Sequence, residues 1–351
     1  MTGAPPVERA IAALRSGRAV VIEGTAPIAV LAVETATPAM LDLADAQARA
    51  DLLVSGARAA ALGLGNRLDA ADPARPVRIV RTGWLNDDTA RALVDAGRDM
   101  DRAPIGPLAT REIDGEREAV AALTLARLGG LLPALWWIEP SAEIIARVDV
   151  DLLLGATPQA NIVARANLPL DDLPPTQIIA FRASDDGEEH VALMVGAPGG
   201  QPPLVRLHSE CLTGDVFGSL KCDCGLQLKH ALRLIGEAGG GVLLYLRQEG
   251  RGIGLANKLR AYQLQDRGLD TVDANRRLGF ADDERDYTMA AAMLHALGVD
   301  SIRLLTNNPA KVEGLATAGI TVVERVAHHM PVNPHNADYL ETKRSRSGHL
   351  A

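Results

Sequence analysis

The second half of the chain alternates strand-like and helix-like segments, and this alternation restricts its fold more than any other feature. Short runs rich in branched apolar residues predict strands at "TQIIAFRA", "HVALMVG", "VLLYLRQ", "SIRLLTNNP" and "TVVERV". Longer runs with apolar residues at helical spacing predict helices, for example at "LQLKHALRLIGEAGGG" and "GLANKLRAYQLQDRG". Such alternation favours a largely parallel or mixed sheet with helices on its faces.

The first half contains both kinds of segment as well, so we expect two α/β domains, residues 1–170 and residues 171–351. Helices are predicted at "VERAIAALRSG" and "EREAVAALTLARLGG", and strands at "RAVVIEG" and "LLPALWWIEP". We interpret residues 37–64 as one or two helices and residues 156–175 as a Pro-rich connection.

The charge of the chain excludes some classes of partner. Its formal net charge is −8 at pH 7, which argues against general nucleic-acid binding through a basic surface. An anionic substrate would need a local cluster of basic side chains instead. The sequence has no secretory signal pattern and no uncharged apolar stretch approaching about 18 residues, so we expect a cytoplasmic protein without a membrane span.

Chemically reactive side chains are concentrated in the second half. Residues 1–180 contain no Cys, His, Lys, Tyr or Phe, whereas all eight histidines lie at position 190 or later. The first part keeps carboxylates, Arg and hydroxyl groups for polar chemistry. We therefore interpret it as a scaffold.

All three cysteines, Cys211, Cys222 and Cys224, lie within "HSECLTGDVFGSLKCDC". Thiolate sulfur is a preferred zinc ligand, and catalytic zinc sites have three protein ligands with a fourth position left for water. Such a site lowers the pKa of bound water to about 7 and so supplies hydroxide, and the neighbouring Glu210 offers a carboxylate for proton transfer. Two other interpretations stay open. His208 could complete a Cys₃His structural site, or the cysteines could have no metal role.

Basic side chains near the cysteine segment are candidates to bind a polyphosphate. They are Arg206, Arg251, Arg285 and Lys311, each of which could alone be a solvated surface group. The glycines of "EGRGIG" follow a predicted strand and precede a predicted helix, which can present backbone N–H groups to an anion, although a bare G-x-G more often marks a turn. Asp283 in "DDERDY" is either a helix N-cap or a functional carboxylate.

Four long motifs follow one another in the second half: "RLHSECLTGDVFGSLKCDCGLQL", "LLYLRQEGRGIGLANKLRAYQLQDRGLDTVDAN", "LGFADDERDY" and "RLLTNNPAKVEGL". They closely resemble GTP cyclohydrolase II, and the resemblance runs from about residue 176 to the tail. It implies a GTP cyclohydrolase II-like fold for the C-terminal domain. It also implies release of formate from C8 of GTP and of diphosphate, in the first step of riboflavin biosynthesis. One zinc ion per subunit, Mg²⁺ with the triphosphate and a homodimer are further implications of the resemblance.

The resemblance also implies roles for individual residues, with the three cysteines as the zinc ligands. Asp283 would be a proton acceptor, Arg285 the nucleophile that attacks the α-phosphate, and Tyr262 would lie over the reacting ring. Because a protonated guanidinium has no free lone pair, the chemistry of the residue favours charge stabilisation by Arg285, and both roles stay open. The implied GTP-binding residues are Arg206, Leu207, His208, Ser209, Glu210, Gln227, Glu249, Gly250, Arg251, Thr271, Thr306 and Lys311.

Two stretches of the first half, "VERAIAALRSGRAVVI" and "GEREAVAALTLARLGGLLPA", resemble parts of 3,4-dihydroxy-2-butanone 4-phosphate synthase. The acidic metal-binding loop of that family is replaced here by "EGTAPIAV", and its His-Thr-Glu by Gly115-Glu116-Arg117 or neighbouring residues. We therefore interpret residues 1–170 as a degenerate, non-catalytic relative. The alternatives are a zinc-stabilised GTP-binding regulator without turnover and a bifunctional enzyme with an active N-terminal synthase domain.

Overall fold

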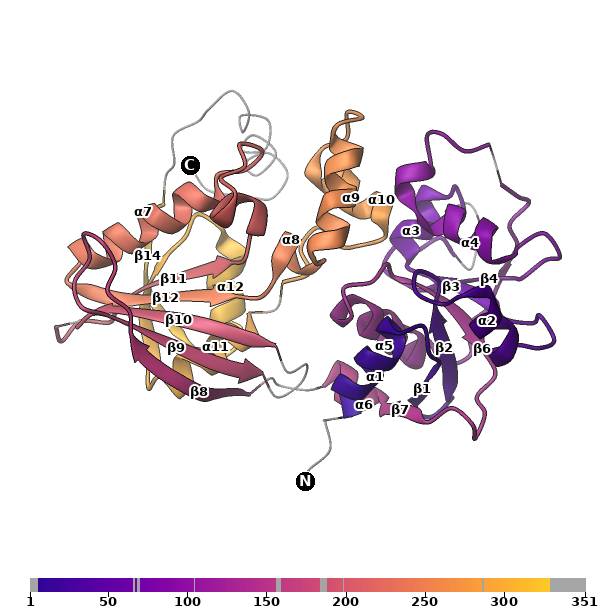
Figure 1. Cartoon of the computed structure of the whole chain (residues 1–351), viewed down its shortest axis with the longest axis horizontal. Coiled ribbons are helices and arrows are strands. Elements are labelled where there is room, and N and C mark those ends of the chain that lie inside the picture. Colours follow the sequence, from indigo (N-terminus) through magenta and orange to yellow (C-terminus); the bar gives the residue numbers. More distant parts are fainter. Residues whose placement is uncertain are drawn as a thin grey trace. The chain divides into compact units, whose positions relative to one another are not determined.

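The computed structural model describes residues 6–328, apart from residues 66, 68–69, 104, 156–158, 184–187, 198 and 286. The chain forms two compact units (Figure 1). The first contains Met1–Ala156 together with Ile253–Glu284, and the second contains Thr157–Gly252 together with Arg285–Ala351. The sequence suggested one boundary near residue 170. The structure instead divides the chain after Ala156 and includes the Ile253–Glu284 segment in the first unit.

The first unit is built on a sheet of the strands β1 (Val20–Glu23), β2 (Ile28–Ala32), β3 (Asp51–Val54), β4 (Val77–Ile79), β5 (Thr110–Arg111), β6 (Ala134–Ile138) and β7 (Ala146–Asp149). Their order across the seven-stranded sheet is β5-β4-β3-β6-β2-β1-β7. β1 pairs in parallel with β7, and the other neighbouring strands pair antiparallel.

Helices cover both faces of this sheet, because successive strand residues point to opposite sides. Val20 and Ile22 share an apolar core with α1 (Pro6–Arg15), α5 (Glu116–Leu128) and α6 (Val150–Leu154). Val21 and Leu52 face the opposite core, which is closed by α2 (Pro38–Ala44), α3 (Gly56–Ala61), α4 (Asp87–Val94), α9 (Leu255–Gln265) and α10 (Thr271–Leu278). The Ile253–Glu284 segment, which contains α9 and α10, is therefore part of the core of the first unit.

The helices and strands predicted at α1, α5, β1 and β6 are confirmed, whereas the interpretation of residues 37–64 as one or two helices missed a strand between two helices. That stretch contains α2, then the strand β3, then α3. β3 lies between β4 and β6, and every one of its residues is buried. Pairing along both edges and burial on both faces outweigh the helix propensity of the neighbouring alanines.

The second unit is built on a sheet of β8 (Ala160–Asn167), β9 (Thr176–Ala183), β10 (Glu189–Gly196), β11 (Leu204–Ser209), β12 (Gly240–Leu246), β13 (Ser301–Leu305) and β14 (Thr321–Val326). Their order is β14-β13-β11-β12-β10-β9-β8. β12, β11, β13 and β14 are parallel, whereas β8, β9 and β10 pair antiparallel with their neighbours. The predicted mixed sheet is thus confirmed, but β8 occupies part of the stretch that was interpreted as a connection.

Helices again lie on both faces. Ile235 of α7 (Cys224–Glu237) shares a core with Leu243 of β12, and α11 (Thr288–Ala296) and α12 (Pro309–Thr317) share the other core with Leu244. Two short helical turns, η3 (Leu212–Val216) and α8 (Glu249–Gly252), follow β11 and β12. Among the described residues, no helix combines the length and apolar character needed to cross a membrane.

Candidate functional site

Polar residues follow the carboxyl ends of the parallel strands in the second unit. Glu210 follows β11, Arg247 follows β12, Thr306 follows β13, and His328 lies shortly after β14. Carboxyl ends of parallel strands meet at one edge of a sheet, and ligands of open α/β sheets bind there. Several side chains around this edge are polar and yet almost fully buried: Arg206, His208, Asp223, Glu249, Thr306, Asn308, Lys311 and His328.

The three cysteines converge at this edge from different elements. Cys211 lies between the end of β11 and the start of η3, Cys222 lies in the loop before α7, and Cys224 is the first residue of α7. Their sulfur atoms all lie within 4.8 Å of one another, and Cys211 Sγ and Cys222 Sγ are 3.6 Å apart. Two ligands of a tetrahedral zinc ion at about 2.3 Å each would be about 3.8 Å apart, so the spacing fits such an ion.

Gly214 allows the loop to close around the sulfur atoms. A Cβ atom at this position would lie 2.8 Å from Cys222 Sγ and 3.0 Å from Cys211 Sγ, closer than ordinary carbon–sulfur contacts. The loop therefore holds the three thiols together only because this residue has no side chain. This close approach supports a cluster built for a common ligand.

His208 does not join the cysteine cluster. Among the described residues, the group of possible metal ligands contains only the three cysteines. His208 Nε2 instead lies 3.1 Å from each carboxylate oxygen of Asp215. Burial lowers the pKa of His208, although its hydrogen bond to Asp215 opposes that shift. Because its Nε2 is engaged by Asp215 and the ring lies outside the cysteine group, His208 does not support the Cys₃His alternative.

Asp215 is a central residue of the site that the sequence analysis did not single out. Besides its contact with His208, its carboxylate accepts hydrogen bonds from the Tyr245 hydroxyl at 2.9 Å and from the Cys211 backbone N–H at 3.0 Å. It thereby fixes the backbone of a cysteine of the cluster. The one available signal was its place four positions after Cys211 in the cysteine segment.

Arg206 supplies a buried positive charge next to the cysteine segment. Its guanidinium donates to the Leu305 carbonyl at 3.0 Å and to Gln227 Oε1 at 2.6 Å, and Gln227 Nε2 donates to Asp223 Oδ2 at 2.6 Å. Burial lowers the pKa of Arg206 to about 10, although the charges of Cys224 and Asp223 oppose this. Arg206 Nε has no partner among the described residues, so it can still donate to a ligand.

Other residues implied by the resemblance lie in the same unit. Lys311 in α12 is buried, and its Nζ donates to the carbonyl oxygen of Leu207 at 2.7 Å. Thr306 Oγ1 accepts from the Asn308 backbone N–H at 3.0 Å. Ser209 ends β11. The loop after β13 and the first turn of α12 thus bring a hydroxyl group and a cation to the same sheet edge.

The turn after β12 adds a carboxylate and an unusual backbone. Glu249 Oε2 accepts from the Leu212 backbone N–H at 2.7 Å, which ties α8 to the cysteine segment. Gly250 and Arg251 both have left-handed backbone angles, with φ of 64° and 63°. This conformation is strained for Arg251, and strained residues with polar side chains are frequent at functional sites.

Glu210 carries a carboxyl group next to the cluster. Burial raises the pKa of Glu210, whereas the guanidinium of Arg247, 3.0 Å away, opposes the rise. A raised pKa brings a carboxyl group closer to the range in which general acid–base groups exchange protons.

The remaining residues implied by the resemblance divide between the two units. Tyr262 in α9, Thr271 at the start of α10 and Asp283 after α10 belong to the first unit, whereas Arg285 belongs to the second. Asp283 is not the N-cap of α11, which is Tyr287, and it lies in a non-helical stretch. The positive charge of Arg285 is near enough to Arg206 to lower the pKa of Arg206. Two neighbouring cations favour an anionic ligand.

His328 is a further buried residue that the sequence analysis did not place in the site. Its ring stacks on His230 with centroids 5.1 Å apart, and neither of its ring nitrogens has a partner among the described residues. Burial, together with the charges of Arg206 and His230, lowers the pKa of His328 to about 3. The ring is therefore neutral in the folded chain at any pH above that value.

The stability of the chain is expected to depend on this histidine in acid. A histidine in the unfolded chain has a pKa near 6.5, so below that pH the unfolded chain binds a proton that His328 does not bind in the folded chain. The contribution of the neutral ring to the free energy of unfolding is therefore lost progressively as the pH falls from about 6.5 towards 3. His328→Leu should show a smaller drop in thermal midpoint between pH 7 and pH 4 than the original chain, measured by calorimetry. The exposed His295 provides the control, and an unchanged drop in His328→Leu would contradict the prediction.

Comparisons with known proteins agree with the resemblance of the motifs. A family model described as GTP cyclohydrolase II matches residues 161–327. The GTP cyclohydrolase-2 of Azospirillum brasilense is 46% identical over 365 residues, covering 98% of this chain and 93% of that protein. The riboflavin biosynthesis protein RibBA of Salinispora tropica is 44% identical, covering 82% of this chain and 76% of that protein. The GTP cyclohydrolase-2 of Enterobacter sp. is 57% identical over 196 residues, covering 55% of this chain and 98% of that protein.

Proposed function

This chain belongs to the GTP cyclohydrolase II family, and we propose that it hydrolyses GTP to 2,5-diamino-6-(5-phospho-ribosylamino)pyrimidin-4(3H)-one, formate and diphosphate in the first step of riboflavin biosynthesis. The observation that carries the proposal is the cluster of three thiols at the carboxyl edge of the parallel strands, beside buried basic side chains. The reaction needs a nucleophile for C8 of the purine ring and cations for a triphosphate. The second unit offers residues for both requirements.

We propose that Cys211, Cys222 and Cys224 hold one zinc ion, since their sulfur spacing fits such an ion. Zinc with three protein ligands supplies a hydroxide nucleophile at neutral pH, because it lowers the pKa of water from 15.7 to about 7. Asp215 keeps the backbone of Cys211 in place. Glu210, the residue before Cys211, is the nearest candidate in sequence to transfer protons during the opening of the ring.

We assign the substrate-binding role to the residues implied by the motifs. Arg206 and Lys311 are buried cations, and buried positive charge attracts phosphate oxygens more strongly than exposed charge does. Mg²⁺ is proposed to accompany the triphosphate. In the first unit, Tyr262 is proposed to contact the reacting ring and Thr271 to contact the substrate.

Asp283 and Arg285 are proposed to act at the α-phosphate. Both residues lie in a non-helical stretch of the chain. We assign Arg285 the stabilisation of negative charge that develops during release of diphosphate, and Asp283 the acceptance of a proton.

The part of the chain before Ala156 is proposed to be catalytically silent, because it contains no Cys or His to bind a metal or transfer protons. We also propose that the active form is a homodimer. A catalytically silent N-terminal part is compatible with a structural role.

The proposed function is tested by incubating the purified chain with GTP and measuring formate and the diaminopyrimidine, with and without a chelator. We expect turnover that chelation removes and added zinc restores. Turnover that survives complete removal of the metal would overturn the zinc proposal. Binding of GTP without any formate would identify a regulator instead, and conversion of ribulose 5-phosphate to dihydroxybutanone phosphate would identify a bifunctional enzyme.

A further inference from the structure

The Ile253–Glu284 segment contains three residues assigned above to the cyclohydrolase reaction, namely Tyr262, Thr271 and Asp283. Its apolar side chains are nevertheless buried in the core that the N-terminal sheet forms. Leu264 is 0% exposed, Leu278 1% and Phe280 2%, and all three belong to the same apolar cluster as the strands β2, β3 and β6. The N-terminal part, by which we mean the Met1–Ala156 portion of the first unit, therefore contributes the surface on which this segment packs.

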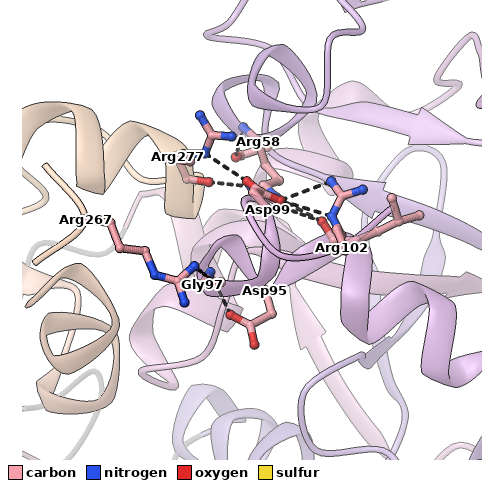
Figure 2. A network of polar contacts seen from close by, with 9 residues as sticks. Arg58, Asp95, Gly97, Asp99, Arg102, Arg267 and Arg277 are labelled. Atoms are coloured by element: carbon pink, nitrogen blue, oxygen red, sulfur yellow. Dashed lines mark hydrogen bonds and ion pairs between the residues drawn. The ribbon is translucent and has the colours of Figure 1, made fainter. Parts of the chain in front are cut away.

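A buried ionic network joins the segment to the N-terminal part (Figure 2). Asp99 directly follows the short turn η2 (Ala96–Arg98), and its side chain is only 2% exposed. Its carboxylate accepts two hydrogen bonds from Arg58 at 2.7 Å each, one from Arg277 of α10 at 3.0 Å and further ones from Arg102 at 3.1 and 3.3 Å. One carboxylate is thus shared by three arginines, one of which belongs to the segment.

Arg58 also caps the end of α10. Its Nη1 donates to the carbonyl oxygen of Arg277 at 2.8 Å, while its Nε and Nη2 donate to the carbonyl of Leu93 at 3.0 and 2.6 Å. The last carbonyl groups of a helix have no partner within the helix, and this contact satisfies one of them beside the left-handed C-cap Gly279. The end of α10 in turn determines where the chain leaves toward Asp283.

Further contacts restrain other parts of the segment. Arg267, between α9 and α10, donates to the Gly97 carbonyl at 2.9 Å (Figure 2). It also pairs with Asp101 at 2.6 Å. On the two sides of Asp283, Asp282 pairs with Arg276 at 2.7 Å, and Glu284 is contacted by Arg127 of α5.

We propose that the N-terminal part is a positioning scaffold for the cyclohydrolase, in which Asp99 holds the Ile253–Glu284 segment through Arg277 and Arg58. The inference rests on the proposed function, because it gives that segment a role in GTP turnover. Asp99 is a positioning residue and does not touch the substrate. Burial would raise the pKa of Asp99, but the hydrogen bonds and charges of Arg58 and Arg102 outweigh burial and keep this pKa below its ordinary value. The Asp99 carboxylate is therefore charged at neutral pH.

The test uses the full-length chain with Asp99→Asn, which keeps the shape of the side chain and removes its charge. We expect kcat for formate release to fall on the order of 10²-fold, because small displacements of reacting groups have effects of that size. The zinc content should remain that of the original chain, because the cysteines belong to the other unit. Asp99→Glu should recover part of the activity. Arg277→Gln, which alters a side chain that is 33% exposed, repeats the test if Asp99→Asn does not fold.

Asp51→Asn is the matched control. Asp51 is a buried aspartate of the same unit, but it pairs with Arg78 and Arg111 and accepts from the Arg81 backbone N–H, all within the N-terminal part. We expect it to lower the thermal midpoint while kcat stays within about twofold. An unchanged kcat in Asp99→Asn and Arg277→Gln, or an equal loss in Asp51→Asn at equal loss of stability, would overturn the proposal.

Hydrogen exchange separates this inference from the proposed function, because it needs no turnover. Amides of α9 and α10 should lose protection in Asp99→Asn and keep it in Asp51→Asn. If the original chain releases no formate from GTP, the proposed function fails, whereas the exchange measurement still decides whether Asp99 holds the segment. Unchanged protection of α9 and α10 in Asp99→Asn would show that it does not.

Discussion

Cys222→Ser is expected to remove the bound metal and to abolish formate release from GTP. A serine hydroxyl is a poor zinc ligand at neutral pH, and only two thiols would remain of a cluster whose sulfur atoms lie within 4.8 Å of one another. Without the metal, the pKa of the attacking water returns from about 7 toward 15.7, so the loss should exceed about 10³-fold. Metal content by atomic emission and formate release should fall together.

The control for this substitution is Ser219→Ala in the same loop. The Ser219 hydroxyl accepts a long hydrogen bond of 3.3 Å from the Lys221 backbone N–H, and the loss of this hydroxyl leaves the three cysteines in place. We expect unchanged metal content and activity. A Cys222→Ser chain that binds no metal but still releases formate at the original rate would exclude the proposed role of zinc.

Arg285→Ala is expected to lower turnover by about 10²–10³-fold, the usual effect of removing a group that stabilises charge in the transition state. Arg285→Lys should retain more activity, because lysine keeps the positive charge that the anionic phosphate needs, although it loses the planar fork. The measurement is kcat for release of both formate and diphosphate. Arg233→Ala, at an exposed position of α7, should stay within about twofold of the original chain.

The same variants separate the two roles considered for Arg285. A nucleophilic arginine requires a covalent nucleotide adduct, which intact-protein mass measurement after rapid mixing with GTP would detect. Charge stabilisation predicts no adduct and graded activity in the order Arg, Lys, Ala. Accumulation of an adduct that disappears in Arg285→Lys would favour the nucleophile.

The proposed scaffold concerns this chain and is not a requirement of its family. The Enterobacter relative aligns along 98% of its own length with 55% of this chain, so a family member can lack a counterpart to much of it. In this chain, by contrast, Leu264, Leu278 and Phe280 are buried in a core that includes N-terminal strands. The Ile253–Glu284 segment of this chain thus packs on an N-terminal part that contains no Cys or His.

The sequence by itself determined the features that depend on local spacing. The alternation of apolar periods predicted the mixed sheet of the second unit, and three cysteines within one short segment predicted a cluster of sulfur atoms. Both depend on residues close in sequence, whose relative positions the backbone restricts directly. The long motifs identified the family for the same reason, because they are contiguous.

Only the tertiary structure decided which distant residues meet. It showed β3 within a stretch that reads as helix, Asp215 as the partner of His208, and Ile253–Glu284 packed in the first unit and tied to Asp99. Such pairings depend on burial and hydrogen bonding between segments far apart in the chain. These long-range contacts can outweigh local propensity, and a single sequence carries no record of them.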